Sequence, residues 1–277
     1  MPQNVFRCRD TAFPLGCRTY IMGILNLTPD SFSDGGLYVS REAALVRALE
    51  MQTEGADLID VGAVSTRPGS VPADEAEELR RLSFLGEICG ALSVPVSVDT
   101  YRPRIVEYAL SCGAKIINDV SGEFNPDMAS LVRESGCGYI VMHSPTRNAG
   151  DAFAYPEGVV RHVQCFFDEI MARLSDAGVL PQNICLDPGF GFGKNTQENL
   201  LLLQGLDALD TGGVCLLSAL SRKRFVRVLT DAPAEDCDAA TAAGCVISVQ
   251  KGADMVRVHN VRDCARAVRL ADLVYRT

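Results

Sequence analysis

Eight apolar runs of strand length recur along the chain, and a longer segment with helical spacing follows each of them. Their apolar positions are nearly continuous rather than alternating, which is typical of strands that are buried on both faces. The runs begin near residues 20, 57, 94, 115, 138, 184, 214 and 255. The pattern therefore predicts parallel strands covered by helices.

The segments between these runs predict helices, and most of them end at a glycine, which commonly follows a helix C-terminus. The predicted helices are 41–55, 73–92, 102–112, 126–135, 158–177, 196–209, 239–251 and 261–275. Strand–helix alternation repeated eight times predicts a (β/α)8 TIM barrel. An open doubly wound sheet is the alternative, but no Gly-x-Gly-x-x-Gly loop follows the first strand.

Length and composition narrow the class of protein. Residues 1–19 are expected to form a short cap, and residues 1–277 a single domain with its core at about 20–276. The net charge of −9 disfavours nucleic-acid binding, and no apolar run is long enough to predict a membrane span. The N-terminus lacks a signal-peptide core, and the eleven cysteines form no C-x-x-C pair. We therefore expect reduced thiols in a cytoplasmic protein, without structural zinc.

In a barrel of this kind, chemistry occurs at the carboxyl ends of the strands, which share one rim. Each predicted strand brings a polar or ionisable residue to that rim. These residues are Asn26, Asp60, Asp99, Thr100, Asn118, Asp119, His143, Asp187, Ser221, Arg222, Lys223, Arg257 and His259. One such residue is an ordinary turn residue, but eight strands ending in this way predict an active site.

Three loops at this rim have unusual sequences. Asp187 ends a strand and precedes Pro188 and three closely spaced glycines, which permit a tight loop. The loop 28–36 is long and polar, as expected of a lid over a barrel mouth. In the loop 65–69, Pro68 restricts the backbone of Arg67 and so orients its guanidinium.

The stretches IMGILNLTPDSFSDGG, STRPG, SVDT, IINDVSG, DPGFGFGKN, SRK and RVHNV resemble the motifs of the dihydropteroate synthase family, in the same order. The resemblance runs from about residue 20 to the end, and its first two motifs are the most specific. It implies condensation of 6-hydroxymethyl-7,8-dihydropterin pyrophosphate with p-aminobenzoate, which yields dihydropteroate and pyrophosphate. We therefore expect an enzyme of folate biosynthesis that transfers an alkyl group.

The resemblance also implies roles for individual residues. Lys223, Arg257 and Arg67 are expected to be catalytic. The pterin is expected to contact residues that can accept or donate along its ring edge, namely Asp99, Asn118, Asp187, Lys223 and Phe192. The aminobenzoate is expected to contact residues in the loops after the second, sixth and seventh predicted strands, namely Thr66, Arg67, Pro68, Phe190 and Arg224.

The diphosphate is expected to bind Asn26, Arg257 and His259. Arg257 and His259 alternate along the last strand, so both are expected to face the same side, at the position where barrels commonly hold phosphate. Asn26 resembles the family's magnesium ligand, and Mg2+ would take its other ligands mainly from diphosphate oxygens and water. No covalent nucleophile is expected, so the cysteines have no catalytic role.

Several positions differ from the family pattern and leave alternatives open. Gly62-Ala63-Val64-Ser65 stands where the family usually has Gly-Gly-Glu-Ser, and His143-Ser144-Pro145 where it has Met-His-Met. Arg224 stands where the family commonly has a serine, and it either binds the aminobenzoate carboxylate or blocks its slot. The alternatives are a pterin-dependent corrinoid methyltransferase and a non-catalytic pterin-binding paralogue. A homodimer is expected, with Ala239–Val249 as one candidate face.

Overall fold

The computed structural model describes residues 4–27, 36–64, 73–146, 151–233 and 236–276. Within them, eight parallel strands close into a barrel in the order β10-β3-β4-β5-β6-β7-β8-β9. The strands are β3 (Tyr20–Asn26), β4 (Leu58–Gly62), β5 (Val96–Asp99), β6 (Ile116–Asp119), β7 (Gly138–Met142), β8 (Ile184–Asp187), β9 (Cys215–Ser218) and β10 (Met255–Val258). All eight predicted strands are present, so the predicted TIM barrel is confirmed.

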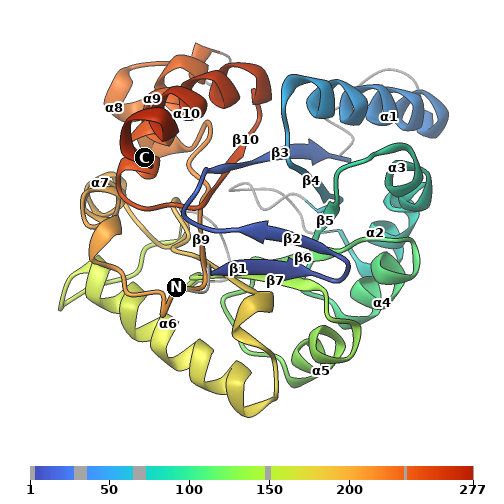
Figure 1. Cartoon of the computed structure of the whole chain (residues 1–277), viewed down its shortest axis with the longest axis horizontal. Helices are drawn as coiled ribbons and strands as arrows, with labels where there is room; N and C mark the ends of the chain where they lie inside the picture. The colour runs from blue at the N-terminus through green and yellow to red at the C-terminus, as the bar shows by residue number, and fades with distance from the viewer. Residues whose placement is uncertain (1–3, 28–35, 65–72, 147–150, 234–235, 277) are drawn as a thin grey trace.

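Helices surround the barrel on its outside (Figure 1). They are α1 (Gly36–Glu54), α2 (Glu75–Arg81), α3 (Leu85–Ala91), α4 (Pro103–Ser111), α5 (Pro126–Ser135), α6 (Val159–Asp176), α7 (Thr196–Gln204), α8 (Arg224–Thr230), α9 (Asp238–Gln250) and α10 (Val261–Tyr275), with short 3-10 turns η2 (Pro181–Asn183) and η3 (Leu206–Ala208). Among the described residues, no helix combines the length and apolar character that crossing a membrane requires.

Two helix predictions were wrong. The predicted helix 73–92 is divided into α2 and α3 by a turn, because Leu82 and Phe84 would point to roughly opposite sides of one continuous helix. The turn lets both side chains reach the core, where they are 0% and 7% exposed. The short helix α8, which begins directly after the Ser-Arg-Lys stretch, was not predicted.

A hairpin closes the amino-terminal end of the barrel, as the predicted cap requires. Its strands β1 (Val5–Cys8) and β2 (Thr11–Pro14) pair antiparallel and lie across the barrel in Figure 1. Phe6 and Phe13 from the hairpin pack in one buried cluster with barrel residues such as Met22 and Leu58. The interior of this end is therefore filled with side chains, so chemistry must occur at the other end.

The strand register aligns the polar strand ends at the opposite rim. Asn26 lies beside Gly62, Gly62 beside Asp99, and Asp99 beside Asn118, so four adjacent strands contribute one continuous row. Residues paired in this way project to the same side of a parallel sheet. The closed sheet therefore brings together residues that are far apart in the sequence.

Candidate active site

A buried cluster of acids around one arginine forms the floor of the barrel mouth. The Arg257 Nε donates to Asp60 Oδ2 at 2.7 Å, and its Nη2 donates to Asp99 Oδ2 at 3.2 Å. Asp60 also accepts hydrogen bonds from Ser97 Oγ at 2.6 Å and from Asn118 Nδ2 at 3.0 Å. Asp60 is thus the shared acceptor that orients both Arg257 and Asn118, although its side chain is fully buried.

Asn118 presents an acceptor that the described residues leave unsatisfied. Its Nδ2 must be the atom that faces Asp60, because a carboxylate can only accept. Its Oδ1 is buried and has no hydrogen-bond partner among the described residues. A buried acceptor without a donor costs about 1–3 kcal/mol, so this oxygen favours a ligand that carries an N–H group.

Asp99 lies next to Asn118 in the same row. Burial raises its pKa to about 7, against the lowering effect of the Arg257 charge, and the neighbouring Asp60 raises it further. A pKa so close to neutrality is common at functional sites, where two acids share one region of low dielectric constant. Asp99 can therefore either accept or donate a proton near physiological pH.

Asp187 stands at the end of β8, where its loop begins. Its Oδ1 accepts the backbone N–H of Gly189 at 2.7 Å. Burial raises the Asp187 pKa, and the positive charge of Lys223 opposes that shift. Gly189 has φ +70°, and a Cβ there would lie 1.9 Å from the carbonyl oxygen of His143. Only glycine fits this position, and the resulting turn fixes the direction of the carboxylate.

Lys223 reaches the same loop from the segment before α8. Its Nζ donates to the carbonyl of Phe190 and lies 4.7 Å from the centre of the Phe192 ring. Burial lowers the Lys223 pKa to about 8, while the Asp187 charge opposes that effect. The structure thus brings together Lys223, Phe192 and Asp187, all three of which were predicted to contact one ligand.

Asn26 and Asp99 face each other across a space that Gly62 keeps open. A Cβ on Gly62 would lie 3.5 Å from Asn26 Oδ1 and 3.8 Å from Asp99 Oδ2. Among the described residues, no group of three or more His, Cys, Asp or Glu side chains could hold a metal ion. The single amide oxygen of Asn26 fits a Mg2+ ion that takes most of its ligands from a phosphate and water.

The predicted cationic pair at the end of β10 has two different sets of partners. Arg257 contacts Asp60 and Asp99 inside the barrel, as described above. His259 lies just beyond the strand, where its Nδ1 is 2.9 Å from Ser221 Oγ and its backbone N–H donates to the same oxygen at 3.2 Å. The expectation that both side chains act on one anion stays a prediction.

Of the residues predicted to bind the aminobenzoate, only Phe190 and Arg224 lie in the described part of the chain. Phe190 is fully buried and stacks on Phe225, with ring centres 5.8 Å apart, so the structure does not bring its ring to the mouth. Arg224 is the exposed first residue of α8. Thr66, Arg67 and Pro68, like the loop 28–35, lie outside the described residues.

Other rim residues have structural partners. Asp119 accepts from the hydroxyl of Tyr139 at 2.8 Å, and both side chains are buried. Arg222 forms a bidentate ion pair with Asp238, at 2.7 and 2.8 Å. Asp60 was predicted at the rim but given no role of its own, and the buried Lys194 was not predicted as a site residue. In the motif LIDVG, Asp60 lies two residues before Gly62, so both residues face the same side of the strand. This alternation was the one indication in the sequence that Asp60 points into the barrel.

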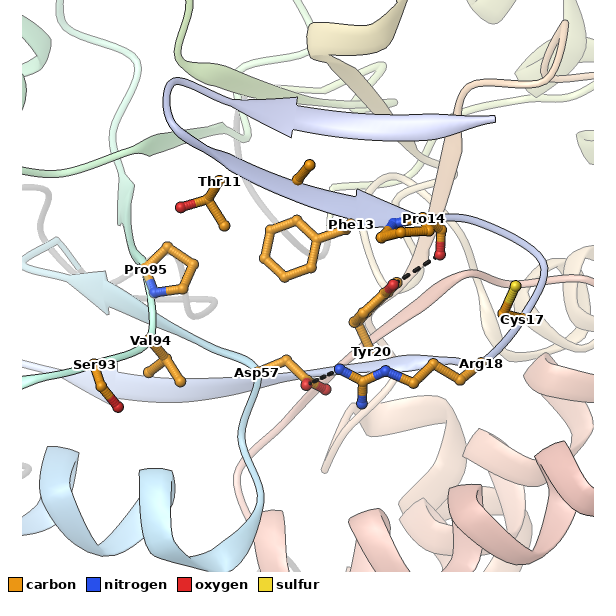
Figure 2. A pocket seen from close by; sticks show the side chains of 11 residues that line it. Thr11, Phe13, Pro14, Cys17, Arg18, Tyr20, Asp57, Ser93, Val94 and Pro95 are labelled. Atoms are coloured by element: carbon orange, nitrogen blue, oxygen red, sulfur yellow. Dashed lines mark hydrogen bonds and ion pairs between the residues drawn. The ribbon is translucent and has the colours of Figure 1, made fainter. Parts of the chain in front are cut away.

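A separate pocket of about 580 Å3 opens at the hairpin end of the barrel. Figure 2 shows its lining, which includes Phe13, Tyr20 and Pro95 together with an ion pair of Arg18 and Asp57. It lies beside the starts of the strands rather than their ends. Residues at that end of a TIM barrel usually serve stability, so the candidate site is the opposite mouth.

Comparisons with known proteins show which family the chain resembles. The profile of a family described as pterin binding enzyme matches residues 22–259. Dihydropteroate synthase of Bacillus subtilis (strain 168) is 39% identical over 275 residues, which cover 97% of this chain and 93% of that protein. The relative from Clostridium beijerinckii is 38% identical and covers 95% of this chain and 97% of its own length.

Solved structures of related proteins also resemble this chain over nearly its full length. Dihydropteroate synthase of Xanthomonas albilineans with 4-aminobenzoic acid superposes with a TM-score of 0.91 at 37% identity, covering 98% of both chains. The Thermus thermophilus enzyme in complex with 4-aminobenzoate gives a TM-score of 0.86 at 38% identity, covering 98% of this chain and 100% of that one.

Proposed function

Because the chain belongs to the pterin-binding enzyme family, we propose that its barrel mouth carries out the dihydropteroate synthase reaction. The enzyme is a transferase of alkyl groups other than methyl. It condenses 6-hydroxymethyl-7,8-dihydropterin pyrophosphate with p-aminobenzoate and forms dihydropteroate and pyrophosphate in folate synthesis. The observation that carries this proposal is the buried, unpaired Oδ1 of Asn118 between Asp99 and the Asp60–Arg257 pair.

The pterin fits this arrangement of acceptors. Its fused ring presents adjacent N–H donors along one edge, and the carboxylate of Asp187 is the buried acceptor that would receive them. Asn118 Oδ1 and Asp99 would accept from the other edge, while the Lys223 ammonium would donate to the ring carbonyl. Charge-assisted hydrogen bonds of this kind contribute roughly 1.5–3 kcal/mol each. Phe192, which lies under Lys223, would cover one face of the ring.

The chemical step breaks one C–O bond and forms one C–N bond. The bond between the pterin methylene and the diphosphate oxygen breaks first, and the oxygen leaves with the electron pair. The aniline nitrogen then attacks the cationic methylene and loses one proton to the released pyrophosphate or to water. Asp99 and Asp187 would stabilise the developing positive charge, and this electrostatic effect would be the enzyme's main contribution.

The leaving diphosphate requires positive charge and hydrogen-bond donors. His259 and Arg257 at the end of β10 would supply them, in the region where TIM barrels commonly hold phosphate. Asn26 would hold a Mg2+ ion together with diphosphate oxygens, and the ion would neutralise the charge on the leaving group. Thr66, Arg67 and Pro68 would close over the aminobenzoate, and Arg224 would bind its carboxylate. Phe190 would support this slot from below rather than line it.

We also propose a homodimer that forms through α8, α9 and α10, which lie together on one side of the barrel (Figure 1). The segment Ala239–Val249 mainly covers the barrel, since Thr241, Gly244 and Cys245 are buried. Within this segment Ile247 is the exposed large apolar side chain, and the others on this side are Val228 and Leu229 of α8 and Leu270, Leu273, Val274 and Tyr275 of α10. All eleven cysteines are free thiols, which supports the proposal that the enzyme works in the cytoplasm.

A turnover assay tests the proposed reaction. The purified enzyme is incubated with the pterin pyrophosphate, p-aminobenzoate and Mg2+, and both products are quantified by chromatography. The proposal predicts dihydropteroate and pyrophosphate in equal amounts, and almost none with an Asp187→Asn variant that folds normally. If the folded wild-type enzyme binds the pterin but forms no dihydropteroate, it is a binding paralogue and the proposed reaction is wrong.

A further inference from the structure

Directly behind the Asp187 loop, a buried lysine and two histidines form a continuous chain of hydrogen bonds. Lys194 Nζ is 2.9 Å from His143 Nδ1, and His143 Nε2 is 2.9 Å from His162 Nδ1. Lys194 and His143 are only 8% and 1% exposed. We call Lys194, His143 and His162 the Lys194 network. None of its residues has a role in the reaction described above.

The Lys194 side chain folds back onto its own loop. Its Nζ also donates to the carbonyls of Gly189 at 2.9 Å and of Phe192 at 3.0 Å. These carbonyls belong to the segment that begins just after Asp187 and includes the Gly189 N–H that holds the Asp187 carboxylate. A single ammonium therefore ties the beginning and the middle of the loop to His143, the first residue after β7.

The chemistry of an ammonium group fixes the direction of this chain. An ammonium has three donors and no acceptor, and its three neighbours are two carbonyls and His143 Nδ1. His143 Nδ1 must then be unprotonated, so the proton of the neutral ring lies on Nε2 and is donated to His162 Nδ1. His162 must likewise be neutral, with its proton on Nε2. Two histidine tautomers thus follow from one charge.

The loop has little freedom to find another arrangement. A Cβ on Gly189 would meet the His143 carbonyl oxygen at 1.9 Å, and a Cβ on Gly193 would meet Pro145 Cγ at 2.6 Å. Tyr155 donates to the Gly193 carbonyl at 3.1 Å. The loop therefore packs directly against the segment after β7, and hydrogen bonds from Lys194 and Tyr155 hold it there.

Three charged side chains outside the Lys194 network act on Lys194, namely Lys223, Asp187 and Glu198. Burial lowers the pKa of Lys194 to about 7, and nearby Lys223 lowers it too, whereas Asp187 of β8 and Glu198 of α7 raise it. Burial and the Lys194 charge lower the pKa of His143 to about 2. The same two causes lower the pKa of His162 on α6. Both imidazoles are therefore kept neutral, and at about pH 6, below the pKa of Lys194, the charge lies on the lysine.

We propose that Lys194 is a positioning residue for the pterin site: its ammonium, ordered by neutral His143 and neutral His162, holds the 188–194 loop so that the Asp187 carboxylate points at the substrate. The effect on catalysis rests on the proposed function. The hydrogen-bonded chain itself does not, because it is a property of the unliganded protein.

The protein has only three histidines, and His143 and His162 are two of them, so the first test needs few signals to be assigned. The tag-free protein is labelled with 15N-histidine, and long-range 1H–15N spectra are recorded at about pH 6, where a free histidine is mostly charged. Both rings of the Lys194 network are expected to be neutral and protonated on Nε2. A charged ring, or a proton on His143 Nδ1, would overturn the proposal. This result does not depend on any substrate.

The second test uses Lys194→Met, which leaves two loop carbonyls and His143 Nδ1 without their donor. The loss of kcat/KM is expected to be about tenfold or more, carried by a higher KM for the pterin substrate rather than for aminobenzoate. Lys251→Met is the matched control, because Lys251 forms only an exposed ion pair with Asp207. Equal kinetics of the Lys194→Met and Lys251→Met variants would contradict the positioning role.

A pair of substitutions at His162 separates positioning from simple packing. Asn can present an acceptor where His162 Nδ1 stood, whereas Phe leaves the buried His143 Nε2–H without a partner. We expect His162→Asn to retain most of the wild-type kcat/KM and His162→Phe to lose about fivefold or more in kcat/KM. Equal activities would overturn the proposal. If the wild-type enzyme is inactive while its tautomers are as expected, the proposed function fails and the network stands.

Discussion

Replacing Asp60 by Asn tests the floor of the site, because three separate groups converge on this one buried carboxylate. The substitution keeps the shape of the side chain and removes its charge. The new amide oxygen can take the place of Oδ2, which accepts from Arg257 and Asn118, while its N–H group donates to the Ser97 hydroxyl. The hydrogen bonds can therefore survive, but Arg257 and Asn118 then donate to a neutral oxygen, and Arg257 keeps only one of its two acidic partners.

The size of the effect follows from what Arg257 retains. Removing one partner of a buried ion pair costs about 3–5 kcal/mol when the other charge is left without compensation. Arg257 still has Asp99 at 3.2 Å, so we expect a smaller loss, about 2–3 kcal/mol in the free energy of unfolding. Asn118 then donates to a neutral acceptor, and this weaker orienting hydrogen bond should reduce pterin binding by about 1 kcal/mol, or roughly fivefold in Kd.

Denaturant unfolding and calorimetry with a pterin measure these two effects. Asp207→Asn is the matched control, since Asp207 forms an exposed ion pair with Lys251 and should change stability by less than about 1 kcal/mol. The reasoning fails if Asp60→Asn is as stable as this control and binds the pterin with unchanged affinity. That result would mean that Asp60 does not orient Arg257 and Asn118.

Three further predictions concern pH, the second substrate and assembly. The kcat/KM for the pterin substrate should rise as Asp99 ionises near pH 7 and fall as Lys223 loses its proton near pH 8, and Asp99→Asn should abolish the rising limb. A rising limb that persists in this variant would exclude Asp99 as its cause. Arg224→Ala should raise the KM for p-aminobenzoate about tenfold and leave the pterin KM unchanged, as steady-state kinetics would show; a lower KM would indicate that Arg224 blocks the slot. The double substitution Leu270→Glu and Leu273→Glu should convert the proposed dimer to a monomer in analytical ultracentrifugation, because both side chains are exposed on α10. A persistent dimer would exclude this surface as the interface.

The hydrophobic pattern was sufficient to predict the barrel, because strands buried on both faces have continuous apolar sequences and each ends in a polar residue at one rim. It could not predict the turn between α2 and α3. That turn depends on Leu82 and Phe84 both reaching the core, which is a property of the packed structure and not of the local sequence. The short helix α8 was missed because seven residues are too few for a clear apolar period.

The site was predictable to the extent that strand ends determine it. Asp99, Asn118, Asp187 and Lys223 were predicted to lie together, and the closed sheet brings them to one mouth. The partners of Arg257 were not predictable, since Asp60 is 197 residues away and meets it only after β10 pairs with β3. The direction of Phe190 was missed because the positive φ angles of Gly189 and Gly191 turn its ring toward Phe225.

The central claim is that one heterocycle binds among Asp99, Asn118 and Asp187 at the carboxyl ends of the strands. A crystal structure of the enzyme soaked with a pterin tests it most directly. We expect the ring edge within hydrogen-bond distance of the Asp187 carboxylate and of Asn118 Oδ1, the acceptor that the protein itself leaves unpaired. A pterin bound at the hairpin end, or ring density absent from the mouth at saturating pterin, would contradict it.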